Sequence, residues 1–292
     1  MPESPEVDAL VDELGAQLAG RAITDVDVLE FRVAKTRARP PSSLVGERVT
    51  GALRHGKLVD IVFGETHLVV SLGRHGWARW RDGDSDDAAA YDAPVTGAAD
   101  ADAGPAPALV TLEFDNGRAL EFTDAGGWVS LGLSVVDDPA EVAAVAKLGP
   151  DPADPEFLRA DFDQAVVGRR KQIKAVLQEQ ESLAGIGNAY SDEILHTAKI
   201  SPIAHAAALT EAELDRLFDT MVGTITTAIA ARRGIPIDEL KATKVAAMRV
   251  HGRAGETCPV CGDTIRDFSF ASTTAQYCPT CQTNGEQLPF RG

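Results

Sequence analysis

The feature that most constrains this chain is the placement of its four cysteines. They form two Cys-x-x-Cys pairs separated by sixteen residues, and the ligand set would be Cys258, Cys261, Cys278 and Cys281. Each pair can bind one side of a tetrahedral ion from a tight turn, and the residues between them suffice for a β-hairpin. The spacing therefore predicts one structural Zn²⁺ ion held by four thiolates. Two disulfides are the alternative, and the absence of a secretory signal in MPESPEVDAL argues against them.

Composition and charge bound the class of protein. At 292 residues and 44% hydrophobic content, the chain is long enough for two domains with cores of their own. No apolar run approaches the roughly 20 residues that span a bilayer, so we expect a protein that enters no membrane. We also expect it to be cytoplasmic and monomeric. The net charge of −16 disfavours a polyanionic partner. Much of that charge, however, falls in an Ala/Asp/Gly-rich stretch at 82–107, which we expect to be a loop insert. The local basic clusters, such as 169–171, either form a basic face or are ordinary solvated charges.

The pattern along the chain predicts an α+β protein of three domains. Residues 4–19 should form a helix, with Ser4 as cap, Pro5 in the first turn and Gly20 at its end. Strand-like runs follow, which together predict a β-sandwich with a leading helix over residues 1–147; they are 23–30, 48–53, 58–63, 67–72, 108–114, 119–123 and 129–135. A Pro/Gly-rich boundary then introduces a helical pattern, and the cysteine hairpin ends the chain. We therefore place a helical domain at 148–245 and the zinc finger at 246–292.

The start of the chain carries a chemical possibility. Removal of Met1 would leave Pro2 as a secondary amine, whose pKa of about 8 leaves a neutral fraction near pH 7. Such an amine can attack an aldehyde-like carbon, and the resulting iminium is an electron sink for elimination. Glu3 beside it could serve as general acid or base. A Met-Pro start without any such role is the plainer interpretation, because a short motif alone is only a hypothesis.

A glycine-rich turn marks the middle of the chain. Gly185, Gly187 and Asn188 should form a turn after which a helix begins. Backbone amides at such a turn, with the Asn side chain, can hold a phosphate. An ordinary corner between two core helices is the alternative.

Taken together, the motifs resemble the Fpg/Nei family of DNA glycosylases. The Pro-Glu-x-Pro-Glu helix, Gly56-Lys57 before a strand, the Gly-Ile-Gly-Asn-Ala-Tyr turn and the cysteine hairpin occur in that family's order over nearly the whole chain. The resemblance implies a bifunctional DNA glycosylase/AP lyase of base-excision repair, associated with the nucleoid. Its partner would be double-stranded DNA that contains damaged bases or abasic sites, and zinc would only hold the finger.

The resemblance also implies a role for each matching residue. Pro2 would attack C1′ of the damaged nucleotide, and Glu3 would protonate the sugar ring oxygen. Lys57 would contact the phosphate beside the lesion. Asn188 would bind backbone phosphate, and Lys174 would help to line that site.

Two loops depart from the family pattern. The family fills the hole left by the extruded base with Met, Arg and Phe. Here Arg74 stands at the Met position, a glycine replaces the base-reading Arg, and Trp128 lies near the Phe position. Arg74 and Trp128 could still stack on bases. Their alternatives are a surface salt-bridge residue and a core aromatic, respectively.

Two further departures bear on substrate and affinity. Thr273 stands where the family's finger carries a phosphate-binding Arg, and 234–244 lacks the loop that caps a flipped oxidised purine. The second change puts oxidised guanine in doubt as the preferred base. A damage-binding paralogue without a glycosylase step remains an alternative, as does a zinc-ribbon scaffold.

Overall fold

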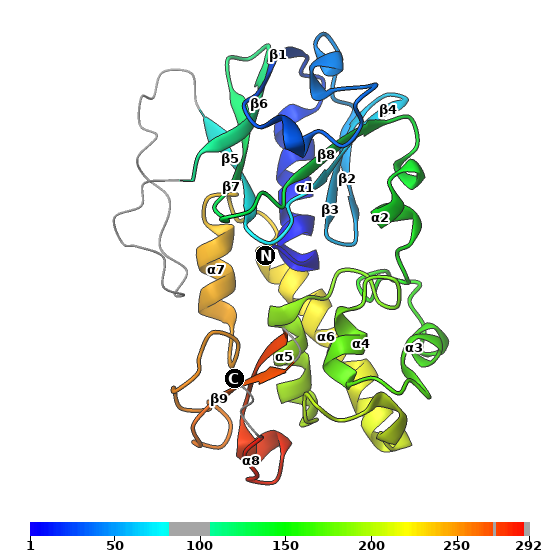
Figure 1. Cartoon of the computed structure of the whole chain (residues 1–292), viewed down its shortest axis with the longest axis vertical. Helices are drawn as coiled ribbons and strands as arrows, with labels where there is room; N and C mark the ends of the chain where they lie inside the picture. The colour runs from blue at the N-terminus through cyan, green and yellow to red at the C-terminus, as the bar shows by residue number, and fades with distance from the viewer. Residues whose placement is uncertain (82–105, 271–272, 289–292) are drawn as a thin grey trace. The chain divides into compact units, whose positions relative to one another are not determined.

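The structure is a computed structural model that describes residues 1–81, 106–270 and 273–288 (Figure 1). The chain divides into two compact units, and two of its helices run from one unit into the other. The first unit comprises 1–147 and 232–243, and the second comprises 148–231 and 244–292. Most of the expected loop insert at 82–107 lies outside the described residues. The three-domain division drawn from the sequence stays a prediction.

The first unit contains a leading helix and two four-stranded antiparallel sheets. Helix α1 spans Ser4–Leu18. One sheet has the order β1 (Ile23–Val28), β6 (Ala108–Phe114), β7 (Ala119–Asp124) and β5 (Gly76–Arg81). The other has the order β2 (Gly51–His55), β3 (Leu58–Phe63), β4 (Thr66–Ser71) and β8 (Gly132–Val136). Short helical turns lie at η1 (Phe31–Val33), η2 (Pro41–Leu44), η3 (Pro139–Glu141) and α2 (Ala143–Ala146). The predicted sandwich with a leading helix is confirmed.

The largest differences from the predicted strands concern β2, β8 and β5, and β1 also ends two residues early, at Val28. β2 begins at Gly51 because Arg48 makes only an isolated bridge, to Ala22. β8 begins three residues later than predicted, because the amides of Ser130 and Leu131 are bound by the Asp124 carboxylate instead of a strand. β5 was not predicted at all. Trp77 and Ala78 are both buried there, so the strand shows no alternation of apolar and polar residues.

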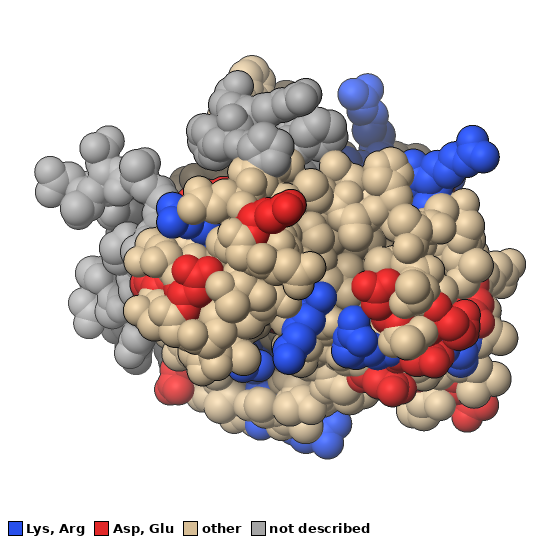
Figure 2. Space-filling view, turned by 90° about the horizontal axis from the view of Figure 1, so that it is seen from below, with Lys and Arg blue, Asp and Glu red and all other residues tan. Residues whose placement is uncertain are grey.

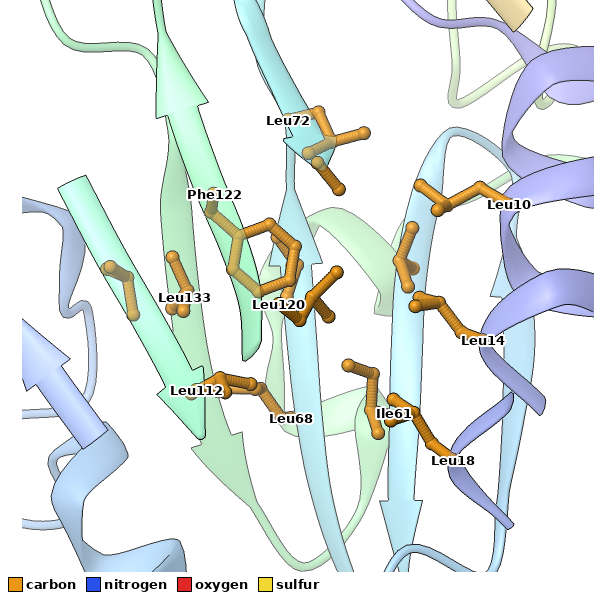
Figure 3. Close-up of a cluster of buried hydrophobic side chains, with 14 of the residues drawn as sticks. Leu10, Leu14, Leu18, Ile61, Leu68, Leu72, Leu112, Leu120, Phe122 and Leu133 are labelled. Atoms are coloured by element: carbon orange, nitrogen blue, oxygen red, sulfur yellow. The ribbon is translucent and has the colours of Figure 1, made fainter. Parts of the chain in front are cut away.

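The core of the first unit packs one face of α1 against inner side chains of the two sheets. Three leucines spaced four residues apart on α1 share one face of the helix and point toward side chains from both sheets (Figure 3). They are Leu10, Leu14 and Leu18, and they meet Ile61, Leu68, Leu72, Leu112, Leu120, Phe122 and Leu133 in one buried cluster. This packing fixes the position of the helix whose first residues follow Pro2.

The segment 232–243 returns to the first unit and is anchored there. Ile237 and Leu240 are fully buried in its core. The Ile237 amide donates to Glu13 Oε2 at 2.7 Å, while Glu13 Oε1 accepts from the indole of Trp80 at 2.7 Å. Arg232 Nε donates to Glu6 Oε1 at 3.1 Å. Residues 232–243 are therefore part of the core of the first unit.

The second unit is helical and ends in a two-stranded hairpin. Its helices are α3 (Arg159–Val166), α4 (Ile173–Gln178), α5 (Asn188–Ala198) and most of α6 (Glu211–Arg232), with η4 (Ala206–Ala208). α7 (Leu240–Ala247) leads toward the antiparallel strands β9 (Arg266–Phe270) and β10 (Thr273–Tyr277), and α8 (Pro279–Gln282) follows. The predicted helical middle and cysteine hairpin are confirmed. Across the described part of the chain, no helix combines the length and apolarity needed to cross a bilayer.

Candidate functional site

The beginning of the chain is held by the first turn of α1. Pro2 and Glu3 are buried, whereas Met1 is 55% exposed. The Glu3 carbonyl accepts the amides of Glu6 and Val7, both at 3.0 Å. In return, the Glu3 amide donates to Glu6 Oε2 at 3.1 Å. This reciprocal pair fixes the backbone next to Pro2.

A single guanidinium connects this start to the turn that carries Lys57. Arg54 Nη1 donates to Ser4 Oγ at 3.2 Å and to the Gly56 carbonyl at 3.0 Å, and Arg54 Nε donates to Asp8 Oδ1 at 3.3 Å. Gly56 has a φ of +57°, a conformation that suits glycine in the two-residue turn between β2 and β3. The structure thus joins the first turn of α1, directly after Pro2 and Glu3, to the Lys57 turn. Arg54 could not be found from the sequence, because its partners on α1, Ser4 and Asp8, lie far from it along the chain.

The loops that carry Arg74 and Trp128 are also connected. The Arg74 amide donates to Ser130 Oγ at 2.9 Å, and Ser130 lies two residues after Trp128. Trp128 is 88% exposed, so the alternative of a core aromatic is wrong. Arg74 is exposed and forms no ion pair with any residue in the described ranges. A large aromatic ring therefore faces solvent on a loop that is hydrogen-bonded to the Arg74 backbone.

Asp124 at the end of β7 orders the Trp128 loop. Its Oδ1 accepts the Gly126 amide at 2.9 Å. Its Oδ2 accepts the amides of Ser130 at 2.7 Å and Leu131 at 3.0 Å, together with the Ser130 hydroxyl at 2.9 Å. Burial raises the pKa of Asp124, but these four donors outweigh it and bring the pKa below its ordinary value. The loop is thus built around an ionised carboxylate.

Substitution of this carboxylate should destabilise the first unit in a pH-dependent way. Asp124→Ala leaves several amides without their acceptor, and we expect a loss of about 1–3 kcal/mol in the free energy of unfolding at pH 7. Because the folded-state pKa is depressed, the contribution is present above the unfolded pKa of about 3.9 and is lost as the pH falls through the folded value. In urea denaturation, the free energies of unfolding of the variant and the parent should become equal as the pH is lowered. The control is Asp25→Ala, at an exposed position of β1. If Asp124→Ala lowered the free energy of unfolding by the same amount at every pH, the role of the ionised carboxylate would be contradicted.

The predicted glycine-rich turn presents Asn188 at the first position of α5. Gly185 has a φ of +88°, and Gly187 is the N-cap residue. Gln178 Nε2 donates to Asn188 Oδ1 at 3.1 Å. Because the amide oxygen is engaged in this way, the Asn188 amide nitrogen is the group left to donate to an external acceptor. A helix does begin directly after the turn, as predicted.

Lys174 lies inside the second unit rather than on its surface. It is 2% exposed, and its Nζ donates to the Asn188 carbonyl at 3.2 Å and pairs with Asp192. Both partners belong to α5, so Lys174 supports the helix that presents Asn188. A direct contact between Lys174 and DNA stays a prediction.

The four cysteine sulfurs form a compact group that fits a zinc ion. All four Sγ atoms lie within 4.8 Å of one another. The separations of 3.9 Å for Cys258–Cys281 and 3.3 Å for Cys261–Cys278 compare with about 3.8 Å for the edge of a tetrahedron with Zn–S bonds of about 2.3 Å. They also exceed an S–S bond of about 2.05 Å, so none of the pairs is a disulfide. Burial raises the pKa of the Cys281 thiol to about 11, and bound zinc would deprotonate it.

Helix α5 fastens the segment that leads into the finger. The Glu193 carboxylate accepts the amides of Arg249, Val250 and His251 at 2.9–3.0 Å. Burial raises the pKa of Glu193, and these three donors oppose the rise. Asp192 Oδ2 accepts from His251 Nδ1 at 2.8 Å. These acceptors could not be found from sequence, because the contacts join residues more than fifty positions apart.

Many of the basic residues noted in the sequence are already paired with carboxylates. Arg169 and Lys171 both bind Glu179, whose pKa falls to about 2, with the Lys171 hydrogen bond as the largest cause. On the face shown in Figure 2, blue and red side chains are interspersed, and red gathers toward one side. The described residues therefore offer scattered cations on this face rather than one basic tract.

Three family models match the chain. They are the formamidopyrimidine-DNA glycosylase N-terminal domain over residues 1–128, the formamidopyrimidine-DNA glycosylase H2TH domain over 148–238, and the zinc finger found in FPG and IleRS over 255–284. These matches cover the sandwich except for β8, the turn that presents Asn188 and the cysteine hairpin.

Curated relatives and solved structures agree with the family models. An uncharacterised formamidopyrimidine-DNA glycosylase-like protein of Mycobacterium tuberculosis is 47% identical over 49% of this chain and 90% of its own length. The formamidopyrimidine-DNA glycosylase of Latilactobacillus sakei is 31% identical over 97% of this chain and 98% of its own. Lactococcus lactis formamidopyrimidine-DNA glycosylase bound to abasic-site DNA has a TM-score of 0.78 at 25% identity, with coverage of 96% and 99%. MutM in complex with DNA containing carbocyclic 8-oxo-G has a TM-score of 0.80 at 25% identity, with coverage of 97% and 100%. This chain belongs to the formamidopyrimidine-DNA glycosylase family.

Proposed function

We propose that this chain is a bifunctional DNA glycosylase and abasic-site lyase of base-excision repair, working on the DNA of the nucleoid. Its partner is double-stranded DNA with a damaged base or an abasic site. The observation that carries the proposal is the connection made by Arg54 between the start of α1 and the Lys57 turn. A nucleophile, an acid and a phosphate-binding cation are the groups that base removal and strand cleavage require.

The chemistry begins when removal of Met1 exposes the Pro2 amine. Its nitrogen forms a bond to C1′ as the bond from C1′ to the base breaks. The base leaves with its electron pair and takes up a proton, and the bonded proline nitrogen gives up the proton that it carried. Glu3 protonates the ring oxygen O4′, so that the C1′–O4′ bond opens and an iminium remains. Loss of a C2′ proton into this electron sink then expels the 3′ phosphate. Lys57 holds the phosphate beside the reacting sugar.

The remaining site residues bind the DNA around the reacting sugar. Asn188 donates its amide N–H to a backbone phosphate, supported by Gln178 and Lys174. Trp128 and Arg74 stack on bases next to the extruded nucleotide. Since many cations are paired within the protein, we expect weak non-specific affinity that falls further with salt.

A panel of lesion-containing duplexes tests the function. Each duplex carries one labelled strand, and the products are separated by size after incubation with protein whose free Pro2 has been checked by intact mass. The proposal predicts nicking of the abasic duplex and of at least one damaged-base duplex. Tight binding to these duplexes without any nicking would instead support a damage-binding paralogue.

Trp128→Ala tests the base-stacking role. Loss of one stacked ring should weaken binding to abasic duplex by about 1–3 kcal/mol, measured by fluorescence anisotropy at fixed salt. The melting temperature should stay unchanged, because the ring is 88% exposed. Phe31→Ala removes another exposed aromatic ring, 79% accessible, from the same unit and is the matched control. Equal losses in both variants would show that the Trp128 ring makes no specific contact.

A further inference from the structure

One buried histidine touches the zinc centre without belonging to its ligand set. His196 lies on α5 and is 2% exposed. Its Nε2 is 3.3 Å from Cys258 Sγ, which is within hydrogen-bond range for a sulfur acceptor. The group of donor atoms that lie within 4.8 Å of one another contains the four sulfurs and not His196. The imidazole therefore forms a second layer behind one zinc ligand.

Because this ring is buried, its polar atoms need hydrogen-bond partners inside the protein. His196 Nδ1 is buried and has no hydrogen-bond partner among the described residues, so Nε2 carries the polar interaction of the ring. A buried polar atom without a partner is unfavourable, and a hydrocarbon ring in this place would avoid it. The compensating interaction is the bond to sulfur. That bond is strongest when the sulfur carries the negative charge of a zinc-bound thiolate.

We infer that His196 is the outer-sphere partner of the zinc site, donating its Nε2–H to Cys258 Sγ and so making α5 part of the metal centre. Outer-sphere donors stabilise the charge on a metal's ligands and fix their orientation. Helix α5 begins at Asn188 and contains His196 two turns later, so one rigid element joins the proposed phosphate contact to the metal. The inference rests on the zinc centre and not on the Pro2 chemistry.

Two substitutions of His196 test the inference. His196→Phe keeps an aromatic ring and removes the donor, whereas His196→Gln keeps an N–H at a similar reach. In the folded protein we expect His196→Phe to bind zinc about 10–100-fold more weakly in competition with a chromophoric chelator. With Co²⁺ in place of zinc, its thiolate-to-metal charge-transfer band should move to lower energy, because the sulfur loses a stabilising hydrogen bond. His196→Gln should retain most of the wild-type zinc affinity, and its charge-transfer band should lie close to the wild-type energy.

The control is Ser201→Ala, which removes a different buried polar atom without a described partner, the Ser201 hydroxyl, from the same unit. It should leave both the zinc affinity and the cobalt band unchanged. Wild-type affinity and an unshifted band in folded His196→Phe would overturn the inference.

A measurement on the unmodified chain keeps the test independent of folding in the variants. In ¹¹³Cd-substituted protein with ¹⁵N-labelled histidine, Nε2 of His196 should carry the ring proton, and this proton should show scalar coupling to cadmium through the sulfur. A ring that carries its proton on Nδ1 instead, with no coupling to the metal, would overturn the proposal. Neither result depends on whether the chain cleaves DNA.

Discussion

A chain whose Pro2 nitrogen is locked in a peptide bond is expected to lose strand cleavage at abasic sites. An amide nitrogen shares its lone pair with the carbonyl, so it can neither attack C1′ nor form an iminium. We expect the rate of nicking to fall by on the order of 10³-fold or more, the scale on which loss of a nucleophile appears in other enzymes. The comparison is between protein with a free Pro2 and protein that retains a Gly-Ser extension before Pro2, with nicking followed on the same duplex.

Two controls separate the loss of the amine from other effects of the extension. Binding of the extended chain to abasic duplex should remain within a few-fold of the parent, which shows that DNA still enters the site. Glu3→Gln leaves the amine intact and should slow opening of the sugar ring, and with it nicking, by about 10²–10⁴-fold, as expected for loss of a general acid. An extended chain that still nicks at the parental rate would show that Pro2 is not the nucleophile.

Removal of the metal should have the largest effect on the stability of the second unit. Structural zinc contributes about 10–16 kcal/mol of apparent binding free energy in isolated finger peptides, and much of this is folding free energy. We therefore expect Cys278→Ala to lose the zinc ion and the ordered hairpin, and to lower the melting temperature of the second unit. We expect the zinc content, measured by plasma mass spectrometry, to fall, and the circular dichroism signal and DNA binding to decrease with it.

The control for this prediction lies between two of the ligands. Val260 is 51% exposed in the first Cys-x-x-Cys turn, so Val260→Ala changes the turn without changing a ligand. It should retain one zinc ion per chain and the parental melting temperature. A metal-free chain that keeps its ordered hairpin and its DNA affinity would contradict the structural role of zinc.

Local signals made part of the fold predictable. Pro5 and Gly20 mark the limits of α1 through backbone preference, and α1 does span Ser4–Leu18. The predicted cap was wrong by one residue, because Glu3 is the N-cap and Ser4 is the first residue of the helix. The two Cys-x-x-Cys pairs define their own geometry, because each pair forms a tight turn whatever surrounds it. Asn116-Gly117 at the β6–β7 turn is a local hairpin signal of the same kind, and Gly117 has a φ of +80° there. In each case the information lies within a few residues of the element.

The rest depends on contacts between distant parts of the sequence. Arg54 meets Ser4 across fifty residues, and His196 meets Cys258 across sixty-two. β5 was missed because its burial on both faces hides the alternation expected of a strand. Neither hydrophobic period nor capping preference carries such information, which is set by tertiary packing.

Peptide mapping of a reduced adduct identifies the protein atom that attacks the sugar. The free-Pro2 protein is incubated with abasic-site duplex and borohydride, digested with trypsin and analysed by mass spectrometry. We expect the deoxyribose remnant on the N-terminal tryptic peptide, attached to the nitrogen of Pro2. Attachment to a lysine such as Lys57, or no adduct in protein that binds the duplex, would contradict it.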